Sequence, residues 1–325
     1  MKNNMKKILI FLFTTTFLLC LLFCSKKCMT LASQGLLIWY QNMIPTLFPF
    51  MVLSGFLVRT RLSDKISILL QPFFGWIFRL PSSMLYGIFM GFLCGFPMGA
   101  KVVADMLEQK QISRKQGEYL LSFCNNIGPL YLLGYVIPLF HWENTTLIFS
   151  IMYGVPLFYG IFLRYFSSYK KFLINGIEYK SQKHKTQNNC TLKTAEHSIN
   201  CSNILHFQLS LQNAIEQITL LGGCMIFFNC LQIYPYLLGE TSGYFFETFF
   251  QTPFCCLLEI GGGLKGFTKD LQNTYFSLCF LTFGGLSCIM QTCFILKNTG
   301  LSIGTYIRHK FIQSLLTGIL VFLIN

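Results

Sequence analysis

The stretch from Gly91 to Pro129 consists of two apolar segments, and each is interrupted by residues that disfavour a continuous helix. The interrupting residues are Gly95, Pro97 and Gly99 in the first segment and Asn125, Asn126, Gly128 and Pro129 in the second. In a membrane, backbone leaves the helical pattern only where it is buried in protein or lines a water-filled cavity. The two breaks therefore predict a polar site inside the bilayer, although Gly and Pro are also commoner in membrane helices than in soluble ones.

The composition is that of a membrane protein. Hydrophobic residues make up 53% of the 325 residues and charged residues 11%, and the mean hydropathy is +0.53. Several apolar runs approach the ~18–20 residues that cross a bilayer as a helix. The net charge of +13 comes from Lys and Arg in the loops between these runs, which is the positive-inside bias. We therefore expect an all-α polytopic membrane protein whose partner is the lipid bilayer and not nucleic acid.

The cysteines and histidines do not form a recognisable site. Most of the 14 cysteines lie inside apolar runs, where Cys behaves as a small apolar residue. The five histidines are scattered, and no Cys or His pair has metal-ligand spacing. The sequence also lacks a P-loop, an HExxH motif and a nucleophile–base pair. It predicts no disulfide framework, no metal, no cofactor and no enzymatic activity.

The loops divide the chain into four parts. Residues 1–34 begin with a basic stretch and an apolar run without a small-residue cleavage site, so they are expected to form an uncleaved signal-anchor helix with a cytoplasmic N-terminus. Residues 35–166 form the first membrane repeat. Residues 167–210 are polar and rich in lysine, and are expected to be a cytoplasmic linker. Residues 211–325 form the second repeat.

We expect about seven transmembrane helices and two broken, re-entrant hairpins. The expected spans are residues 7–24, 35–58, 119–140, 145–166, 211–238, 273–296 and 302–324. Residues 84–103 are long enough to cross, but a crossing would place Lys110, Arg114 and Lys115 outside. A segment that enters and returns at Gly95–Gly99 keeps these charges in the cytoplasm. Arg308 and Lys310 lie early enough in the last span to extend to the inner surface.

The two halves resemble each other in layout. Residues 92–101 and 257–265 are both apolar runs with a glycine-rich break and a lysine, and residues 123–126 parallel 283–287. Three expected crossings separate the two hairpins, and an odd number makes the repeat inverted. Inverted repeats with interrupted helices are typical of secondary transporters, whose site lies at the repeat interface near the midplane.

The candidate ligand-binding residues are those of the breaks and the polar residues beside them. In the first half they are Gly95, Pro97, Gly99, Lys101, Asn125, Asn126, Gly128 and Pro129, and in the second half Glu259, Gly261, Gly263, Lys265, Gly285 and Ser287.

Each polar candidate has an alternative role. Glu259 is expected to be buried with Lys265 or Lys101 as partner and to bind a proton or a cation, unless it lies at the water surface. Asn125 and Asn126 are suited to hydrogen-bond a polar solute, or to cap broken backbone. Lys101 either meets an anionic group or marks the inner boundary of the membrane.

Five motifs carry a resemblance to a known family. They are IPTLFPFMVLSGFLV (44–58), GFLCGFPMGAK (91–101), LLSFCNNIGP (120–129), LLEIGGGLKG (257–266) and FGGLSCIMQ (283–291). Together they resemble the YlbJ family of sporulation integral membrane proteins of endospore-forming Firmicutes, over roughly residues 30–324. That family carries the Gate, or nucleoside-recognition, membrane module. This chain departs from it where Gly261-Gly262-Gly263 replaces Thr-Asn-Gly and where Ile289 replaces a His.

The resemblance implies an integral protein of the mother-cell or forespore membrane that acts in maturation of the spore cortex. Together with the broken helices, it predicts a transporter or receptor of a small polar solute, with a coupling ion. The alternatives are a non-transporting scaffold protein of the developing spore and an intramembrane enzyme acting on envelope precursors.

Overall fold

The computed structural model describes residues 2–167, 169, 192–242, 250–267 and 274–324, and the secondary structure of these residues is helical. Six helices in the described ranges are long and apolar enough to cross a membrane, or seven if a strongly bent pair counts as one span. The prediction of a polytopic all-α membrane protein is therefore confirmed. The protein is an integral membrane protein.

The N-terminal region contains two crossing segments. Its elements are α1 (Lys2–Phe23), α2 (Ser25–Ile38), the π-helical turn η1 (Trp39–Met43) and α3 (Ile44–Arg59). The last three form one apolar segment over Ser25–Arg59. The second span thus begins about ten residues before the expected residue 35. Lys26 and Lys27 are compatible with a helix, and Lys27 is ion-paired with Glu240 of α14.

A helix that bends sharply leads into the first hairpin. Its parts are α4 (Leu62–Leu70), η2 (Gln71–Gly75) and α5 (Trp76–Phe78), and it meets the following helix at 90°. The hairpin itself consists of α6 (Ser82–Cys94) and α7 (Met98–Glu108). A Cβ added to Gly87 of α6 would lie 3.4 Å from the Met106 sulfur of α7. Because Gly87 lies eight residues before the break at 95–97 and Met106 lies nine residues after it, the two arms run antiparallel, as predicted.

The segment after this hairpin is a broken helix and not the continuous span expected at 119–140. It consists of α8 (Arg114–Leu121), a non-helical stretch at 122–128, and then α9 (Pro129–Tyr131), η3 (Leu132–Val136) and α10 (Ile137–Phe140). The break covers Asn125, Asn126 and Gly128, as their helix-breaking character predicts. The predicted break is therefore present, but the prediction that residues 119–140 form one continuous helix is wrong.

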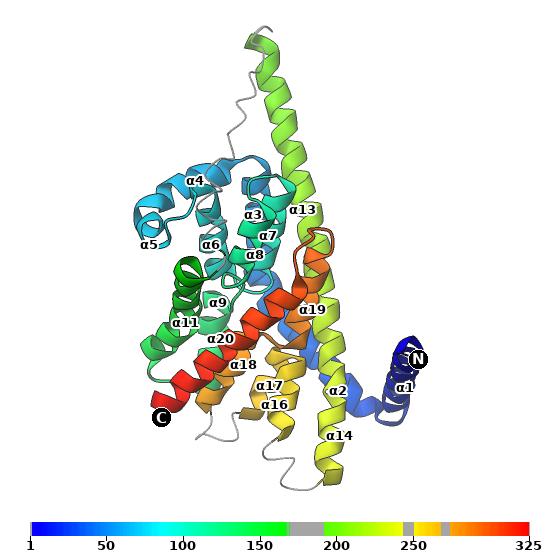
Figure 1. Cartoon of the computed structure of the whole chain (residues 1–325). Coiled ribbons are helices and arrows are strands. Elements are labelled where there is room, and N and C mark those ends of the chain that lie inside the picture. The colour runs from blue at the N-terminus through cyan, green and yellow to red at the C-terminus, as the bar shows by residue number, and fades with distance from the viewer. Residues whose placement is uncertain (1, 168, 170–191, 243–249, 268–273, 325) are drawn as a thin grey trace.

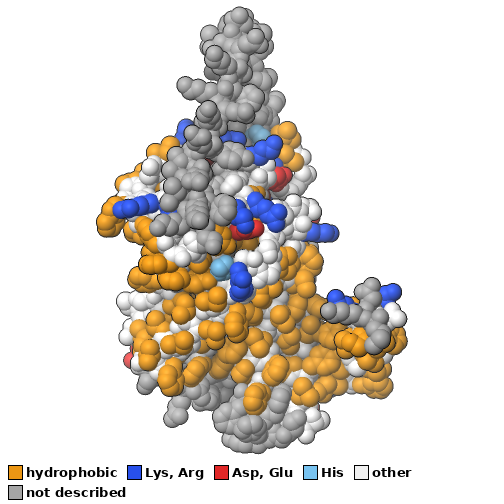
Figure 2. Space-filling view, in the orientation of Figure 1, with side chains coloured by type: hydrophobic (Ala, Val, Ile, Leu, Met, Phe, Trp, Pro, Cys, Tyr) orange, Lys and Arg blue, Asp and Glu red, His pale blue; other side chains and the backbone are white. Residues whose placement is uncertain are grey.

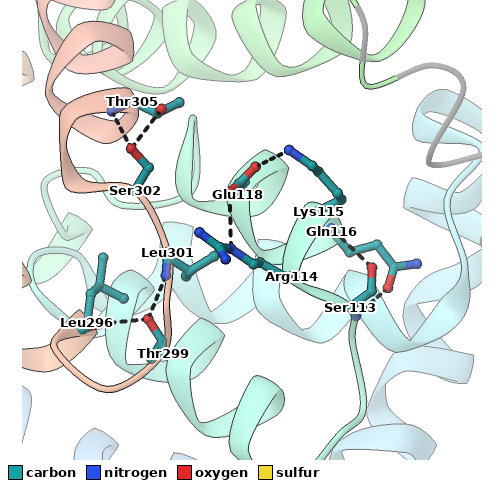
Figure 3. Close-up of polar contacts among 10 residues, drawn as sticks. All are labelled: Ser113, Arg114, Lys115, Gln116, Glu118, Leu296, Thr299, Leu301, Ser302 and Thr305. Carbon is teal, nitrogen blue, oxygen red and sulfur yellow. Dashed lines mark hydrogen bonds and ion pairs between the residues drawn. The ribbon is translucent and has the colours of Figure 1, made fainter.

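The start of α8 is capped by Ser113. The Gln116 N–H donates to Ser113 Oγ (3.4 Å), and the Ser113 N–H donates to Gln116 Oε1 (2.8 Å) (Figure 3). Arg114 and Lys115 both pair with Glu118. A Cβ on Gly300, just before the last helix of the chain, would lie 3.6 Å from Arg114 Nη1. The start of α8 and this turn therefore lie at the same end of the molecule.

Two long helices follow. They are α11 (Thr145–Phe166) and α13 (Leu192–Leu231), and α13 continues after a short interruption as α14 (Ile233–Ser242). Helix α13 begins inside the stretch expected to be a linker, so residues 192–210 are helical and extend the following span. The rest of that stretch, apart from 167 and 169, lies outside the described residues.

The second hairpin repeats the geometry of the first. Helices α16 (Thr252–Leu258) and α17 (Ile260–Phe267) meet at Glu259, whose backbone is extended (φ −146°, ψ 119°). A Cβ on Gly263 would lie 2.5 Å from the Cys256 nitrogen, and one on Gly266 would lie 2.4 Å from Thr252 Oγ1. Both pairs are centred on Glu259, so these arms also run antiparallel.

A second broken helix and a terminal helix complete the chain. They are η6 (Thr274–Phe276), α18 (Ser277–Phe283), α19 (Gly285–Leu296) and α20 (Ile303–Ile324). Gly284 and Gly285 both have positive φ (+94° and +69°) and form the break between α18 and α19. The predicted correspondence between residues 123–126 and 283–287 therefore holds in the structure: both stretches interrupt a helix.

The two hairpins approach the centre of the molecule from opposite ends. Figure 1 shows α6 and α7 in the upper part of the molecule and α16 and α17 in the lower part. Lys and Arg side chains gather in a band across the upper part, above a broad hydrophobic surface (Figure 2). This arrangement is the one that the predicted inverted repeat requires, with the first hairpin entering from the basic end.

Each hairpin tip packs directly on the break of the helix that follows it. In the first half, a Cβ on Gly95 would lie 2.2 Å from the Gly128 nitrogen, and one on Gly91 would lie 2.3 Å from the Cys124 carbonyl oxygen. In the second half, a Cβ on Gly285 would lie 3.0 Å from the Cys256 carbonyl oxygen. These approaches are possible because glycine has no side chain, so the glycines of the breaks are packing sites.

We predict that Gly91→Ala lowers stability, because its methyl group would collide with backbone that cannot move aside. Overpacking of this kind costs about 1–3 kcal/mol. The matched control is Gly223→Ala in α13, where an added Cβ meets no atom within 4 Å and the higher helix propensity of Ala is worth up to about 1 kcal/mol. Thermal unfolding in detergent should show a lower midpoint for the first variant only. Equal midpoints would contradict the close packing.

Candidate functional site

The two hairpin tips and the two helix breaks meet around one buried polar region. The tips are at Gly95–Pro97 and Glu259, and the breaks are at 122–128 and at Gly284–Gly285. A Cβ on Gly284 would lie 3.0 Å from the Phe96 ring, so the first tip touches the second break. The predicted site at the interface of the two repeats is therefore where the four interruptions converge.

A cavity of about 70 Å³ lies in this region. A single water requires about 10–15 Å³, so the space holds several waters or one small solute. Its polar lining includes the side chains of Glu259, Gln291 and Thr46, and Gly128 and Gly261 also border it. The remaining lining is mostly apolar, which is typical of small-molecule sites.

Asn125 connects the first break to the last two helices. Its side chain is fully buried. Its Oδ1 accepts a hydrogen bond from the Ala100 N–H (3.3 Å), and its Nδ2 donates to Thr292 Oγ1 (3.2 Å) and Tyr306 Oη (2.9 Å). Three protein groups thus hydrogen-bond to the side-chain amide of Asn125. This is a structural role, which was the predicted alternative to hydrogen-bonding a solute.

Asn126 also hydrogen-bonds to protein groups, and one of these groups is Lys310, which was expected to lie at the inner membrane surface. Its Nδ2 donates to the Phe123 carbonyl (2.5 Å), and its Oδ1 accepts from Lys310 Nζ (2.9 Å). The Lys310 ammonium also lies 4.7 Å from the centre of the Phe96 ring, a distance at which cation–π attraction operates. One lysine therefore contacts both the first tip and the first break.

The expectation that Lys310 extends to the inner surface is wrong. Its side chain is 1% exposed, and among the described residues no carboxylate lies within ion-pair distance of it. The stabilisation comes instead from an amide oxygen and an aromatic face. The sequence does carry a signal for Lys310, because an ionisable residue inside a membrane span is a candidate functional residue.

Glu259 forms the tip of the second hairpin and is 3% exposed. Its Oε1 accepts a hydrogen bond from the Gly261 N–H (3.0 Å), and its carbonyl oxygen accepts from Gln232 Nε2 (3.1 Å) and the Gly263 N–H (3.1 Å). Its Oε2 has no hydrogen-bond partner among the described residues. The backbone of the tip is therefore fixed, while half of the carboxyl group is unsatisfied.

The expected lysine partners of Glu259 take other positions. Lys101 is paired with Asp105, four residues on along α7, and Lys265 is exposed on the last turn of α17. Ser287 of α19 lies close to the Glu259 carboxyl, and its Oγ accepts a hydrogen bond from Gln291 Nε2 (3.1 Å). The structure thus brings Ser287 to Glu259 and leaves Lys101 and Lys265 away from it.

The remaining candidates are backbone positions. Gly99 packs on the first break, since an added Cβ would lie 2.5 Å from the Cys124 carbonyl oxygen. Pro97 precedes α7, and Pro129 begins α9 after Gly128. Gly261 borders the cavity, whereas Gly263 packs against α16.

Several polar residues of the site were not predicted. They are Thr292, Tyr306, Lys310 and Gln313, whose Nε2 donates to the Ser122 carbonyl (2.5 Å). They lie on α19 and α20 and face the first break, which is far away in sequence. Among the described residues, no group of three His, Cys, Asp or Glu side chains is placed to hold a metal ion.

Comparison with known proteins finds one curated relative. The chain is 26% identical, over 321 aligned residues, to the sporulation integral membrane protein YlbJ of Bacillus subtilis (strain 168), and the match covers 90% of this chain and 76% of that protein. No protein-family model matches the chain, and no solved structure matches it. The resemblance indicated by the sequence motifs is confirmed.

We predict that Asn126 and Lys310 are strongly coupled. Asn126→Leu removes the oxygen that solvates a buried ammonium, and a hydrogen bond to a charged group is worth about 1.5–3 kcal/mol. Replacing Lys310 by Met in the same chain removes the unsolvated charge, so the double variant should be at least as stable as Asn126→Leu alone. A double-mutant cycle from thermal unfolding in detergent measures the coupling.

The control for this cycle is Lys297→Met, which removes an exposed lysine and should combine additively with Asn126→Leu. Additive effects of Asn126→Leu and Lys310→Met would show that the contact contributes nothing.

Proposed function

We propose that this chain, a relative of the sporulation integral membrane protein YlbJ, carries a small polar solute across a membrane of an endospore-forming bacterium during sporulation. The role we assign to the solute is in maturation of the spore cortex. The observation that carries the proposal is the meeting of two antiparallel hairpins, from opposite ends of the molecule, at a cavity bordered by the buried Glu259. Interrupted helices that meet near the midplane are the common architecture of solute sites in secondary transporters.

At the site, each hairpin packs on the break of its own half. The tip of each hairpin contacts that break through glycines. Between the halves, Phe96 lies against Gly284, Asn125 and Asn126 bind α19 and α20, and α13 packs along α2 and α3. Alternating access in such folds is largely rocking of one repeat against the other around a fixed site.

The departures from the family pattern have a local counterpart in the structure. A Cβ at Gly262, where the family has Asn, would lie 2.0 Å from Asn229 Oδ1 of α13. A carboxamide is therefore present next to this position, but it comes from a different helix. This supports a polar second half of the site in which α13 replaces a side chain of the hairpin.

We predict that Leu130→Trp blocks function, whereas Leu133→Trp does not. Both leucines are half exposed (49% and 50%) and lie three residues apart in the same segment, but only Leu130 borders the cavity. The larger ring at 130 should occlude the solute path. The measurement is the yield of heat-resistant spores from a strain in which each variant replaces the native protein, with membrane levels of the protein matched.

A transporter should lose spore yield with Leu130→Trp alone. If both variants sporulate normally, the transport proposal fails and a scaffold role is favoured, because a scaffold does not depend on an open cavity.

A further inference from the structure

We propose that Glu259 is a proton-binding site, and that the protein couples solute passage to the binding of a proton at Glu259 Oε2. This inference rests on the proposed transport function and names its coupling ion. The proton comes from water on one side of the membrane, forms an O–H bond with the carboxylate, and leaves to water on the other side. No other bond is made or broken.

The environment of the Glu259 carboxyl group favours proton binding. The side chain is almost fully buried, and only its Oε1 accepts a hydrogen bond from the backbone, while its Oε2 is unpartnered among the described residues. The group borders the cavity, so a proton can reach it through water in that space. A buried ionised carboxylate without a cationic partner is disfavoured, and such a group takes up a proton instead.

Glu259 is not paired with a cation among the described residues, because the buried Lys310 is held by Asn126 and the Phe96 ring instead. The titratable groups that face Glu259 from the neighbouring elements are Tyr131, Tyr135, Cys224, Cys256 and Cys288. None of these is positively charged at neutral pH. Among the described residues that line the cavity there is also no Lys, Arg or His. The proton is therefore the positive charge that the site can acquire most simply.

A metal cation fits the site less well than a proton. Hard cations such as Ca²⁺ need about six to eight oxygen ligands. Glu259 is the one acidic side chain that borders the cavity among the described residues, and no cluster of three acidic, Cys or His side chains is found in the described ranges. One free carboxylate oxygen can bind one proton without further ligands.

The position of Glu259 connects protonation to the hairpin. The residue is the extended link between α16 and α17, and Gln232 of α13 holds its carbonyl oxygen. The ionised side chain favours hydrogen-bond donors, and Ser287 of α19 is placed to donate to it, while Gln291 of α19 also borders the cavity. Loss of the proton therefore favours a closer contact between the second hairpin and α19.

Asp105 provides an internal comparison. It is also a buried acid, but it is paired with Lys101 on the same helix. A nearby cation favours the ionised form of a carboxylate. The two buried acids of the hairpins therefore differ in whether a cation balances the carboxylate, and Glu259 is the one without such a partner among the described residues.

The test is the reaction of the full-length protein in detergent with dicyclohexylcarbodiimide, an apolar reagent that modifies protonated carboxyl groups. Peptide mass spectrometry locates the product. We expect modification at Glu259 and not at Asp105, with a rate that falls about tenfold per pH unit once the carboxyl ionises. Sodium chloride should not protect Glu259, and Glu259→Gln should remove the labelled peptide, while Glu143→Gln in an exposed loop should not.

Absence of modification at Glu259 in mildly acidic buffer, or protection by Na⁺, overturns the proposal. Infrared difference spectra of the unmodified protein provide a second measurement that does not depend on a variant that folds. The band of a protonated carboxyl should disappear at alkaline pH. The labelling needs no solute, so a transport failure with intact labelling rejects only the proposed function, and normal transport without labelling rejects only the proton site.

Discussion

The fold depends on how broken backbone is satisfied inside a membrane. Each interruption of a membrane helix leaves N–H and C=O groups without helical partners, and lipid cannot supply any. In this protein the breaks lie against one another: the tip at Gly95 packs on the backbone of Gly128, and the Glu259 carbonyl accepts hydrogen bonds from Gln232 and Gly263. The cavity lies where these contacts converge, so the fold and the candidate site have the same physical origin.

Two buried polar networks then join the halves. Asn125 and Asn126 use their amides to bind α19 and α20 through Thr292, Tyr306 and Lys310. Such networks are costly when incomplete and specific when complete. The asparagines therefore connect the two repeats, whereas Glu259 borders the cavity and keeps an unpartnered carboxyl oxygen among the described residues. The amides thus have a structural role, and Glu259 is the residue to which we assign the proposed proton binding.

The sequence predicted the features that depend on local chemistry. Runs of apolar residues indicated the spans, and Gly, Pro and Asn clusters indicated the tips and breaks. The sequence did not predict features that depend on contacts between distant residues. The burial of Lys310, for example, depends on Asn126, which is 184 residues away, and no local pattern indicates this contact. Likewise, the length of residues 119–140 favoured a continuous span, whereas contacts with the first hairpin stabilise a break there.

If the two hairpins enter the membrane from opposite sides, the side on which each hairpin opens can be mapped directly. In a cysteine-free protein, single cysteines at Lys110 and Phe250 mark the open ends of the two hairpins. Cysteines at Asn298 and Asn144 serve as references for the two sides of the membrane, and all four positions are exposed. Labelling with an impermeant thiol reagent in sealed membranes should pair position 110 with 298 and position 250 with 144. If positions 110 and 250 label from the same side, the repeat is not inverted and the account is contradicted.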